Sequence, residues 1–297
     1  MLRSMAQKAL VVLASLSGVL AQLDKPIMSP AVPFDHMDEI LYQNLPSTGS
    51  HYDRWGWGWL PARCKAVAQE RNLNVYDIDV FNVHYDDCDT AWVFCRHHDA
   101  QVTLDQMIDN FGRMPVRLRN MVRAQFAVPG DGLMAYTYSD LGDIIYTGDI
   151  GPYVRFWIHE AGHIIDRREV FEQGDYSSTD AWLNEYNKDS YICDAYAQTN
   201  NAENFAQEVI VGLFDKVVPG GIGSLVPNWN DIFHQYATVQ AVAGDRIIPG
   251  GTCNRFFEDD HIECMGPAAG CESAKRDVEE RDAVFERAPV MCEFHKH

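Results

Sequence analysis

Residues 156–166 read Phe-Trp-Ile-His-Glu-Ala-Gly-His-Ile-Ile-Asp and contain an H-E-x-x-H pattern. On an α-helix, His159 and His163 leave the same face because they are four residues apart. Two neutral imidazoles at this spacing can bind one Zn²⁺. Glu160 then stands beside the metal, where its carboxylate can take a proton from a zinc-bound water. The apolar residues around the pattern predict a buried helix and favour a metal site over a chance match.

A third zinc ligand has to come from elsewhere in the chain, because catalytic zinc usually has three protein ligands. The longer H-E-x-x-H-x-x-G-x-x-H pattern is absent, since residues 164–168 read Ile-Ile-Asp-Arg-Arg. Glu203 and Glu208 are candidates on a second helix, predicted over 202–214. They are five residues apart and cannot share a helix face, so the spacing leaves both open.

The spacing of apolar residues in the rest of the chain predicts an α+β fold. Thr103 is expected to start a helix that Pro115 ends, and the helix pattern then resumes over 116–126. Alternating apolar residues predict strands at 75–83 and 91–94 and a hairpin of 133–138 with 143–147. Further helices are expected from Thr179 or Asp180 through Tyr186, and over 231–242. The hairpin lies just before the H-E-x-x-H helix, so its edge strand could hold an extended peptide.

The N-terminus indicates export. Residues 1–21 carry two basic residues, an apolar run and small residues at the cleavage positions, so they predict a signal peptide and a mature chain from Gln22. Eight cysteines without C-x-x-C fit disulfides in a secreted, extracellular protein. Local spacing suggests Cys88 with Cys95, and pairs within the C-terminal group. No later apolar run is long enough to span a membrane.

The mature chain is expected to form a single domain over 22–271. Prolines in 22–60 suggest an extended arm lying on the domain, or a propeptide, and the charged residues 272–297 suggest a helical or loose tail. The formal net charge of −19 becomes −21 without the signal peptide, which repels nucleic acid and anionic lipid. The oligomeric state stays open.

A second run of residues carries a family resemblance. Residues 196–207 read Y-A-Q-T-N-N-A-E-N-F-A-Q. This run resembles the Y-x-x-T-N-x-x-E-x-F-A-E signature of zinc metallopeptidases of the anthrax lethal factor type, which are gluzincins. The resemblance covers about Trp157 to Phe214, and Gln207 departs from it where that family has glutamate. Together with the signal peptide and scattered cysteines, the motifs also look like the fungal conidiation-specific secreted protein family.

The resemblance implies a zincin-like domain with a mainly antiparallel sheet and two helices that present the zinc. It implies that Glu203 is the third zinc ligand and that Tyr196 helps to stabilise the oxyanion. Asp166 falls where the family often has an aspartate, which leaves it either a partner of a ligand histidine or a solvated residue. Glu208 is then expected on the exposed helix surface.

The expected function is hydrolysis of a peptide or protein substrate by a secreted zinc metalloendopeptidase, with Glu160 as the base and a zinc-activated water as the nucleophile. One alternative is a catalytically silent, zinc-bearing protein of the spore surface or of host interaction. Another is a disulfide-stabilised binding module that uses the tryptophan-rich residues 55–59 for glycan or peptide.

Overall fold

The computed structural model describes residues 22–169, 174–271 and 290–294. Its α-helices are α1 (Phe34–Asn44), α2 (Ala62–Glu70), α3 (Leu104–Arg113), α4 (Val116–Arg119), α5 (Val154–Glu169), α6 (Asp180–Tyr186), α7 (Asn201–Val217) and α8 (Phe233–Ala243). Its strands are β1 (Ser50–Arg54), β2 (Trp59–Pro61), β3 (Ile78–Tyr85), β4 (Trp92–His97), β5 (Ala124–Val128), β6 (Leu133–Tyr138), β7 (Asp143–Thr147), β8 (Ile262–Cys264) and β9 (Val290–Phe294).

A seven-stranded sheet in the order β1-β3-β4-β5-β7-β6-β9 forms the centre of the fold, and β2 pairs with β8 in a small second sheet. Four neighbouring pairs in the large sheet are antiparallel. The two pairs that involve β5 are parallel. The expected α+β class is therefore confirmed, and the sheet is mixed because its centre is parallel.

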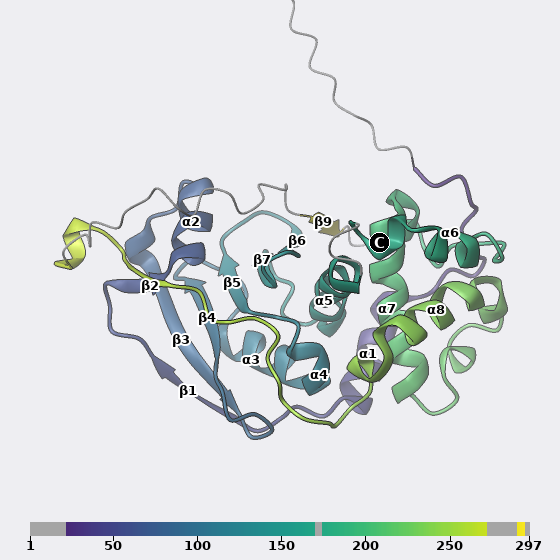
Figure 1. The fold of residues 1–297 in the computed structure, drawn as a ribbon, viewed down its shortest axis with the longest axis horizontal. Helices are drawn as coiled ribbons and strands as arrows, with labels where there is room; N and C mark the ends of the chain where they lie inside the picture. Colours follow the sequence, from purple (N-terminus) through teal and green to yellow (C-terminus); the bar gives the residue numbers. More distant parts are fainter. Residues whose placement is uncertain (1–21, 170–173, 272–289, 295–297) are drawn as a thin grey trace, which may run out of the picture.

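Both faces of the sheet are covered. In β3, Ile78 and Val80 pack on the side of α2 and the small sheet, whereas Phe81 and Val83 pack on the side of α3 and α5. This alternation follows from the two-residue period of a strand. Figure 1 shows the sheet on the left and the helices α5 to α8 on the right, so that α5 lies between the sheet and the remaining helices.

The prediction of a helix over 116–126 is wrong beyond the short α4, because residues 124–128 form β5. Every residue of β5 is buried. A short strand buried on both faces lacks the apolar–polar alternation of a half-buried strand, so periodicity alone does not distinguish it from a buried helix segment. The hairpin of β6 and β7 lies at its predicted residues.

The prediction of an extended arm over 22–60 is correct only for its first part. The backbone N–H of Met28 donates to Ile192 O at 2.9 Å and that of Val32 to Cys193 O at 3.0 Å. After Pro33 the chain forms α1, which buries Met37 and Leu41 in the main core. Apolar side chains spaced three and four residues apart explain this helix. Residues 34–61 are thus part of the domain.

Three disulfides connect the described residues: Cys64–Cys95, Cys88–Cys253 and Cys264–Cys271. The expectation of disulfides and of a pair within the C-terminal group is confirmed. The suggested pair of Cys88 with Cys95 is wrong, because the fold brings Cys253 to Cys88 from 165 residues away.

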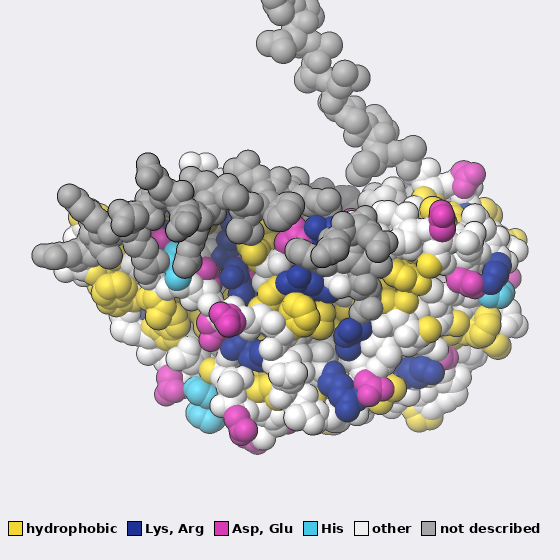
Figure 2. Space-filling model, in the orientation of Figure 1, with side chains coloured by type: hydrophobic (Ala, Val, Ile, Leu, Met, Phe, Trp, Pro, Cys, Tyr) yellow, Lys and Arg dark blue, Asp and Glu magenta, His cyan; other side chains and the backbone are white. Residues whose placement is uncertain are grey.

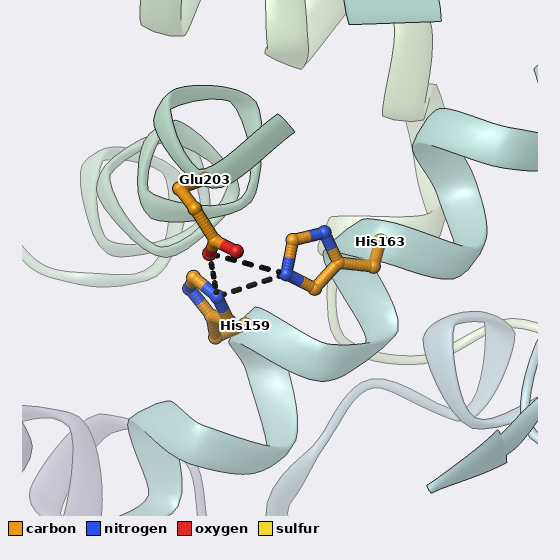
Figure 3. A group of neighbouring side chains, drawn as sticks. All are labelled: His159, His163 and Glu203. Carbon is orange, nitrogen blue, oxygen red and sulfur yellow. Dashed lines mark hydrogen bonds and ion pairs between the residues drawn. The ribbon is translucent and has the colours of Figure 1, made fainter. Parts of the chain in front are cut away.

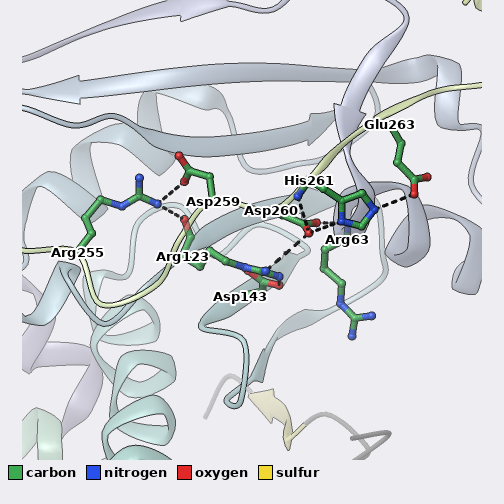
Figure 4. Close-up of polar contacts among 8 residues, drawn as sticks. All are labelled: Arg63, Arg123, Asp143, Arg255, Asp259, Asp260, His261 and Glu263. Atoms are coloured by element: carbon green, nitrogen blue, oxygen red, sulfur yellow. Dashed lines mark hydrogen bonds and ion pairs between the residues drawn. The ribbon is translucent and has the colours of Figure 1, made fainter. Parts of the chain in front are cut away.

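Ion pairs attach the segment before β8 to the sheet (Figure 4). Arg123 donates through Nε to Asp143 Oδ1 at 2.8 Å, and its Nη1 lies 3.8 Å from Asp260 Oδ1. Asp260 also accepts from the backbone N–H of Arg63 at 2.6 Å. Because Arg63 lies on α2, this network joins α2, the start of β7 and the C-terminal segment.

The tryptophan-rich residues form a partly exposed surface near β2. Trp55 is partly buried and donates to Asn82 Oδ1 at 2.8 Å, whereas Trp57 is 54% exposed and Trp59 45%. Ile262 of β8 is also exposed. Figure 2 shows hydrophobic side chains gathered at this end of the molecule, and basic and acidic side chains mixed across the rest of the face.

The predicted charged tail is a strand in part. β9 adds to the edge of the large sheet beside β6, and the remaining residues of 272–297 lie outside the described residues, as do those of the predicted signal peptide. Among the described helices, none has the length and apolar character to cross a membrane.

Candidate metal centre

The helix α5 is fixed at its start by α1. Asp38 accepts the backbone N–H of Arg155 at 2.9 Å and also pairs with the Arg155 side chain. Further along, Trp157 stacks on Tyr146 with ring centroids 4.5 Å apart and donates to Gln125 Oε1 at 2.8 Å. These contacts with β7 and β5 set the rotation of α5, so that His159 and His163 face α7.

Helix α7 approaches α5 closely at Gly162. A Cβ atom on Gly162 would lie 3.2 Å from Ala206 Cα and 3.2 Å from Val209 Cγ2, which is tighter than most Cβ contacts. A glycine at this position has poor helix propensity, but it allows the two helices to pack closely. Asn200 caps α7, since its side chain accepts the backbone N–H of Glu203 at 3.0 Å. Glu203 thereby sits in the first turn, opposite His159.

Three predicted ligands converge between these helices (Figure 3). His159 Nε2 lies 3.0 Å from Glu203 Oε2, His163 Nε2 lies 3.4 Å from the same oxygen, and the two Nε2 atoms are 3.1 Å apart. All three residues are buried. Among the described residues, this is the group of histidine, cysteine or acidic side chains whose atoms lie close enough together to hold a metal ion.

The donor set fits zinc. Ligand atoms about 2.0–2.2 Å from a tetrahedral zinc lie roughly 3.3–3.6 Å from one another. Two of the observed separations, 3.0 and 3.1 Å, are slightly shorter, as expected for side chains that also hydrogen-bond to one another, and the third, 3.4 Å, lies within this range. Burial lowers the pKa of His159. Burial also acts to lower the pKa of His163, but the charge and hydrogen bond of Glu203, together with the charges of Glu160 and Asp166, outweigh it and raise that pKa to about 9.

A chain of hydrogen bonds orients His159. Its Nδ1 lies 2.9 Å from Gln207 Oε1, and Gln207 Nε2 donates to Asp194 Oδ2 at 2.8 Å. Because the Gln207 amide presents its oxygen to the ring, His159 Nδ1 donates and His159 Nε2 keeps its lone pair for the centre. Asp194 also accepts the backbone N–H of Ala197 at 2.7 Å, beside Tyr196. The sequence did not reveal Asp194, because nothing local marks it as the partner of residue 207.

This chain of hydrogen bonds explains the departure at Gln207 and makes a prediction. Gln207→Glu should destabilise the fold, because a carboxylate would replace the amide that donates to Asp194. Adding Asp194→Asn should recover about 1–3 kcal/mol of that loss, since the two side chains are in contact. Urea unfolding of both single variants and the double variant measures the coupling. Additive effects, within about 0.5 kcal/mol, would contradict the proposed contact.

The other residues of the site occupy different positions. Glu160 is fully buried, and its Oε2 accepts a hydrogen bond from the Thr137 hydroxyl. Thr137 lies on β6, and its role was not predicted, although the strand alternation places its side chain on the α5 side. The ring of Tyr196 lies beside His159, with 5.7 Å between the centroids. The structure thus brings Tyr196 to the predicted ligands and Glu160 to β6.

Asp166 is buried and holds the segment that follows α5. Its two oxygens accept hydrogen bonds from the Ser177 backbone N–H at 2.6 Å and the Ser177 hydroxyl at 2.7 Å. Burial raises the pKa of Asp166 to about 7. The interpretation of Asp166 as a solvated residue is therefore wrong, and its hydrogen bonds hold Ser177 in the segment that follows α5.

The expectation that Glu208 is exposed is also wrong. Helix α7 lies between α5 and α8, and Glu208 on its far side from the ligands is fully buried near Cys193. Burial raises the pKa of the Glu208 carboxyl well above its ordinary value. Glu208 is thus a core residue whose charged form is unfavourable in its buried position.

A pH dependence of stability follows. The Glu208 carboxyl has a higher pKa in the folded protein than the value of about 4.3 expected in the unfolded chain. It therefore stabilises the fold most below about pH 4.3, and this stabilisation is lost as the pH rises towards the folded-state pKa. As the pH rises above about 5 towards the folded-state pKa of Glu208, Glu208→Gln should therefore gain stability over the unchanged protein by up to about 1.4 kcal/mol per pH unit. Urea unfolding across this range measures the difference, with the exposed Glu258→Gln as control. A difference that does not change with pH would contradict the raised pKa of Glu208.

The fold and site define an α+β protein with a buried cluster of two histidines and one glutamate that is suited to a metal ion. The chain belongs to the family of conidiation-specific protein Con-13, whose family model matches residues 35–293. The Conidiation-specific protein 13 of Neurospora crassa is 28% identical over 285 residues, which cover 91% of this chain and 81% of that protein. The resemblance to the conidiation-specific family is confirmed, and the name of this relative states no reaction.

Proposed function

We propose that this protein is a secreted zinc metalloendopeptidase with a zincin-like domain. The observation that carries the proposal is the convergence of His159 Nε2, His163 Nε2 and Glu203 Oε2 between two packed helices, with Glu160 next to His159 in sequence. A purely structural zinc needs no adjacent carboxylate base. The hydrogen bond that His159 Nδ1 donates to Gln207 Oε1 orients His159, as the ligand histidines of zinc sites require.

The residues of the chain have distinct roles in this proposal. His159, His163 and Glu203 would hold the zinc, which when bound makes water more acidic and polarises a carbonyl group. The Glu160 carboxylate takes a proton from the attacking water and passes it to the leaving nitrogen of the peptide. Thr137 fixes the Glu160 carboxylate through its hydroxyl. The phenol of Tyr196, whose ring packs beside His159, donates a hydrogen bond to the developing oxyanion.

One observation favours the second candidate function, a catalytically silent protein that keeps zinc for structure. His159 and Glu160 are 0% exposed, and His163 and Glu203 only 2% and 3%. An extended substrate cannot reach a cluster this buried without a change in the surrounding chain. Such a protein would bind zinc and cleave nothing.

The test is cleavage of a diverse peptide library by the zinc-loaded mature protein, with products identified by mass spectrometry. The assay uses the full chain and a chain that ends at Pro289, which lacks the last strand of the sheet. Cleavage that stops on chelation and returns with zinc is expected. Absence of cleavage by both chains, with zinc bound, would contradict the peptidase and favour the silent protein.

A further inference from the structure

The last described strand fills an edge of the sheet that would otherwise be open. β6 pairs with β7 on one side, so β6 would be the outer strand without β9. β9 runs antiparallel to β6, from Leu133 opposite Phe294 to Thr137 opposite Val290. Figure 1 shows β9 at the end of the sheet that lies beside α5. An open strand edge presents unpaired N–H and C=O groups that pair readily with an extended polypeptide.

The β6 edge lies close to Glu160, which adjoins the candidate metal centre. The Thr137 hydroxyl donates to Glu160, and Thr137 is the β6 residue that faces the start of β9. Facing residues in an antiparallel pair have Cα atoms about 4.5–5.5 Å apart. A polypeptide along β6 therefore passes within one strand spacing of the residue that contacts Glu160. In the described fold β9 occupies this position, and Glu160 has no exposed surface.

We propose that the β6 edge is a binding site for an extended polypeptide, and that residues 290–294 are its occupant within the same chain. The chain is latent as long as β9 remains on this edge, and a substrate binds there after β9 leaves. Recognition rests on backbone hydrogen bonds, so the partner class is an extended peptide segment of any sequence that can form a strand. The latency rests on the proposed peptidase function, whereas the docking of a peptide at β6 does not.

The docking is tested without catalysis. The protein carries Glu160→Gln and ends at Pro289, and the probe is a fluorescent synthetic peptide of residues 289–297 with Cys292→Ser. Anisotropy should show saturable binding, at least 10-fold tighter to the shortened chain than to the full chain, because the attached strand competes in the full chain. The control is a peptide of the same length with proline at alternate positions, which cannot donate the hydrogen bonds of a strand. Equal affinity of the probe for both chains, or equal binding of the proline-containing peptide, would overturn the proposal.

A second variant guards against a folding defect in the shortened chain. It keeps the full length but replaces residues 290–294 with Gly-Ser-Gly-Ser-Gly, which forms strands poorly. It should bind the probe as the shortened chain does and keep the circular dichroism of the full chain. Failure of both variants to fold would overturn the proposal, because an occupant that has to leave cannot be required for the fold.

Measurement of peptide hydrolysis distinguishes the proposed latency from the proposed peptidase activity. With Glu160 intact and zinc bound, the shortened chain should cleave library peptides at least 10-fold faster than the full chain. Equal rates would overturn the latency and leave the peptidase standing. Docking of the probe without any hydrolysis would overturn the peptidase and leave the binding edge standing.

Discussion

Glu160→Gln is expected to lower peptide hydrolysis by about 10²–10⁴-fold while the protein keeps its zinc. The amide cannot accept the proton of the attacking water, and general base catalysis is commonly worth this factor. The exchange is nearly isosteric, and a glutamine can still accept the hydrogen bond that Thr137 donates to residue 160. The measurement is kcat/KM on the peptide that the chain cleaves best, together with the zinc content of each variant.

The matched control for this prediction is Glu39→Gln, which changes an exposed glutamate of α1 and should leave kcat/KM unchanged. A Glu160→Gln protein that cleaves at the rate of the control would show that Glu160 is not the base. Loss of zinc together with activity would instead mean that residue 160 supports the metal site.

His163→Gln should remove the zinc. The loss of affinity should exceed about 100-fold, since even the loss of a partner that orients a ligand costs 10–100-fold. Zinc stabilises the fold in proportion to its binding, by about 2.7 kcal/mol at a concentration 100 times its Kd. This stabilisation should disappear in the variant. Competition with a chromophoric chelator gives the Kd, and urea unfolding with and without zinc gives the stabilisation.

His97→Gln is the control for the metal prediction. His97 is a buried histidine of β4, whose Nδ1 accepts the backbone N–H of Asp99 at 3.1 Å, and it is no member of the candidate metal centre. This change should leave the zinc affinity unaltered. Equal zinc affinity in His163→Gln and in the unchanged protein would contradict the assignment of the ligand.

Sequence patterns predicted the features that depend only on residues close together in the chain. The four-residue spacing of His159 and His163 on a helix, the cap at Thr103 and the hairpin of β6 with β7 all follow from neighbouring residues. The contact of Glu203 with the histidines needed the family resemblance as well, because the spacing left Glu208 equally open.

The remaining features depend on distant parts of the chain. Glu208 is buried because α8 covers the far side of α7, and a helix packed on two sides has no polar face to reveal it. Asp194 and Thr137 reach the site through tertiary contacts. β9 joins the sheet from a charged sequence context, and its partner β6 lies about 150 residues earlier. Sequence reasoning at short range does not detect such pairings.

The most direct test of the central claim is anomalous X-ray scattering at the zinc edge from crystals of the zinc-loaded protein. One strong peak is expected at the candidate metal centre, within about 2.0–2.2 Å of His159 Nε2, His163 Nε2 and a Glu203 carboxylate oxygen. Absence of a peak there, or a zinc ion bound only by other residues, would contradict the assignment of this centre as a zinc site.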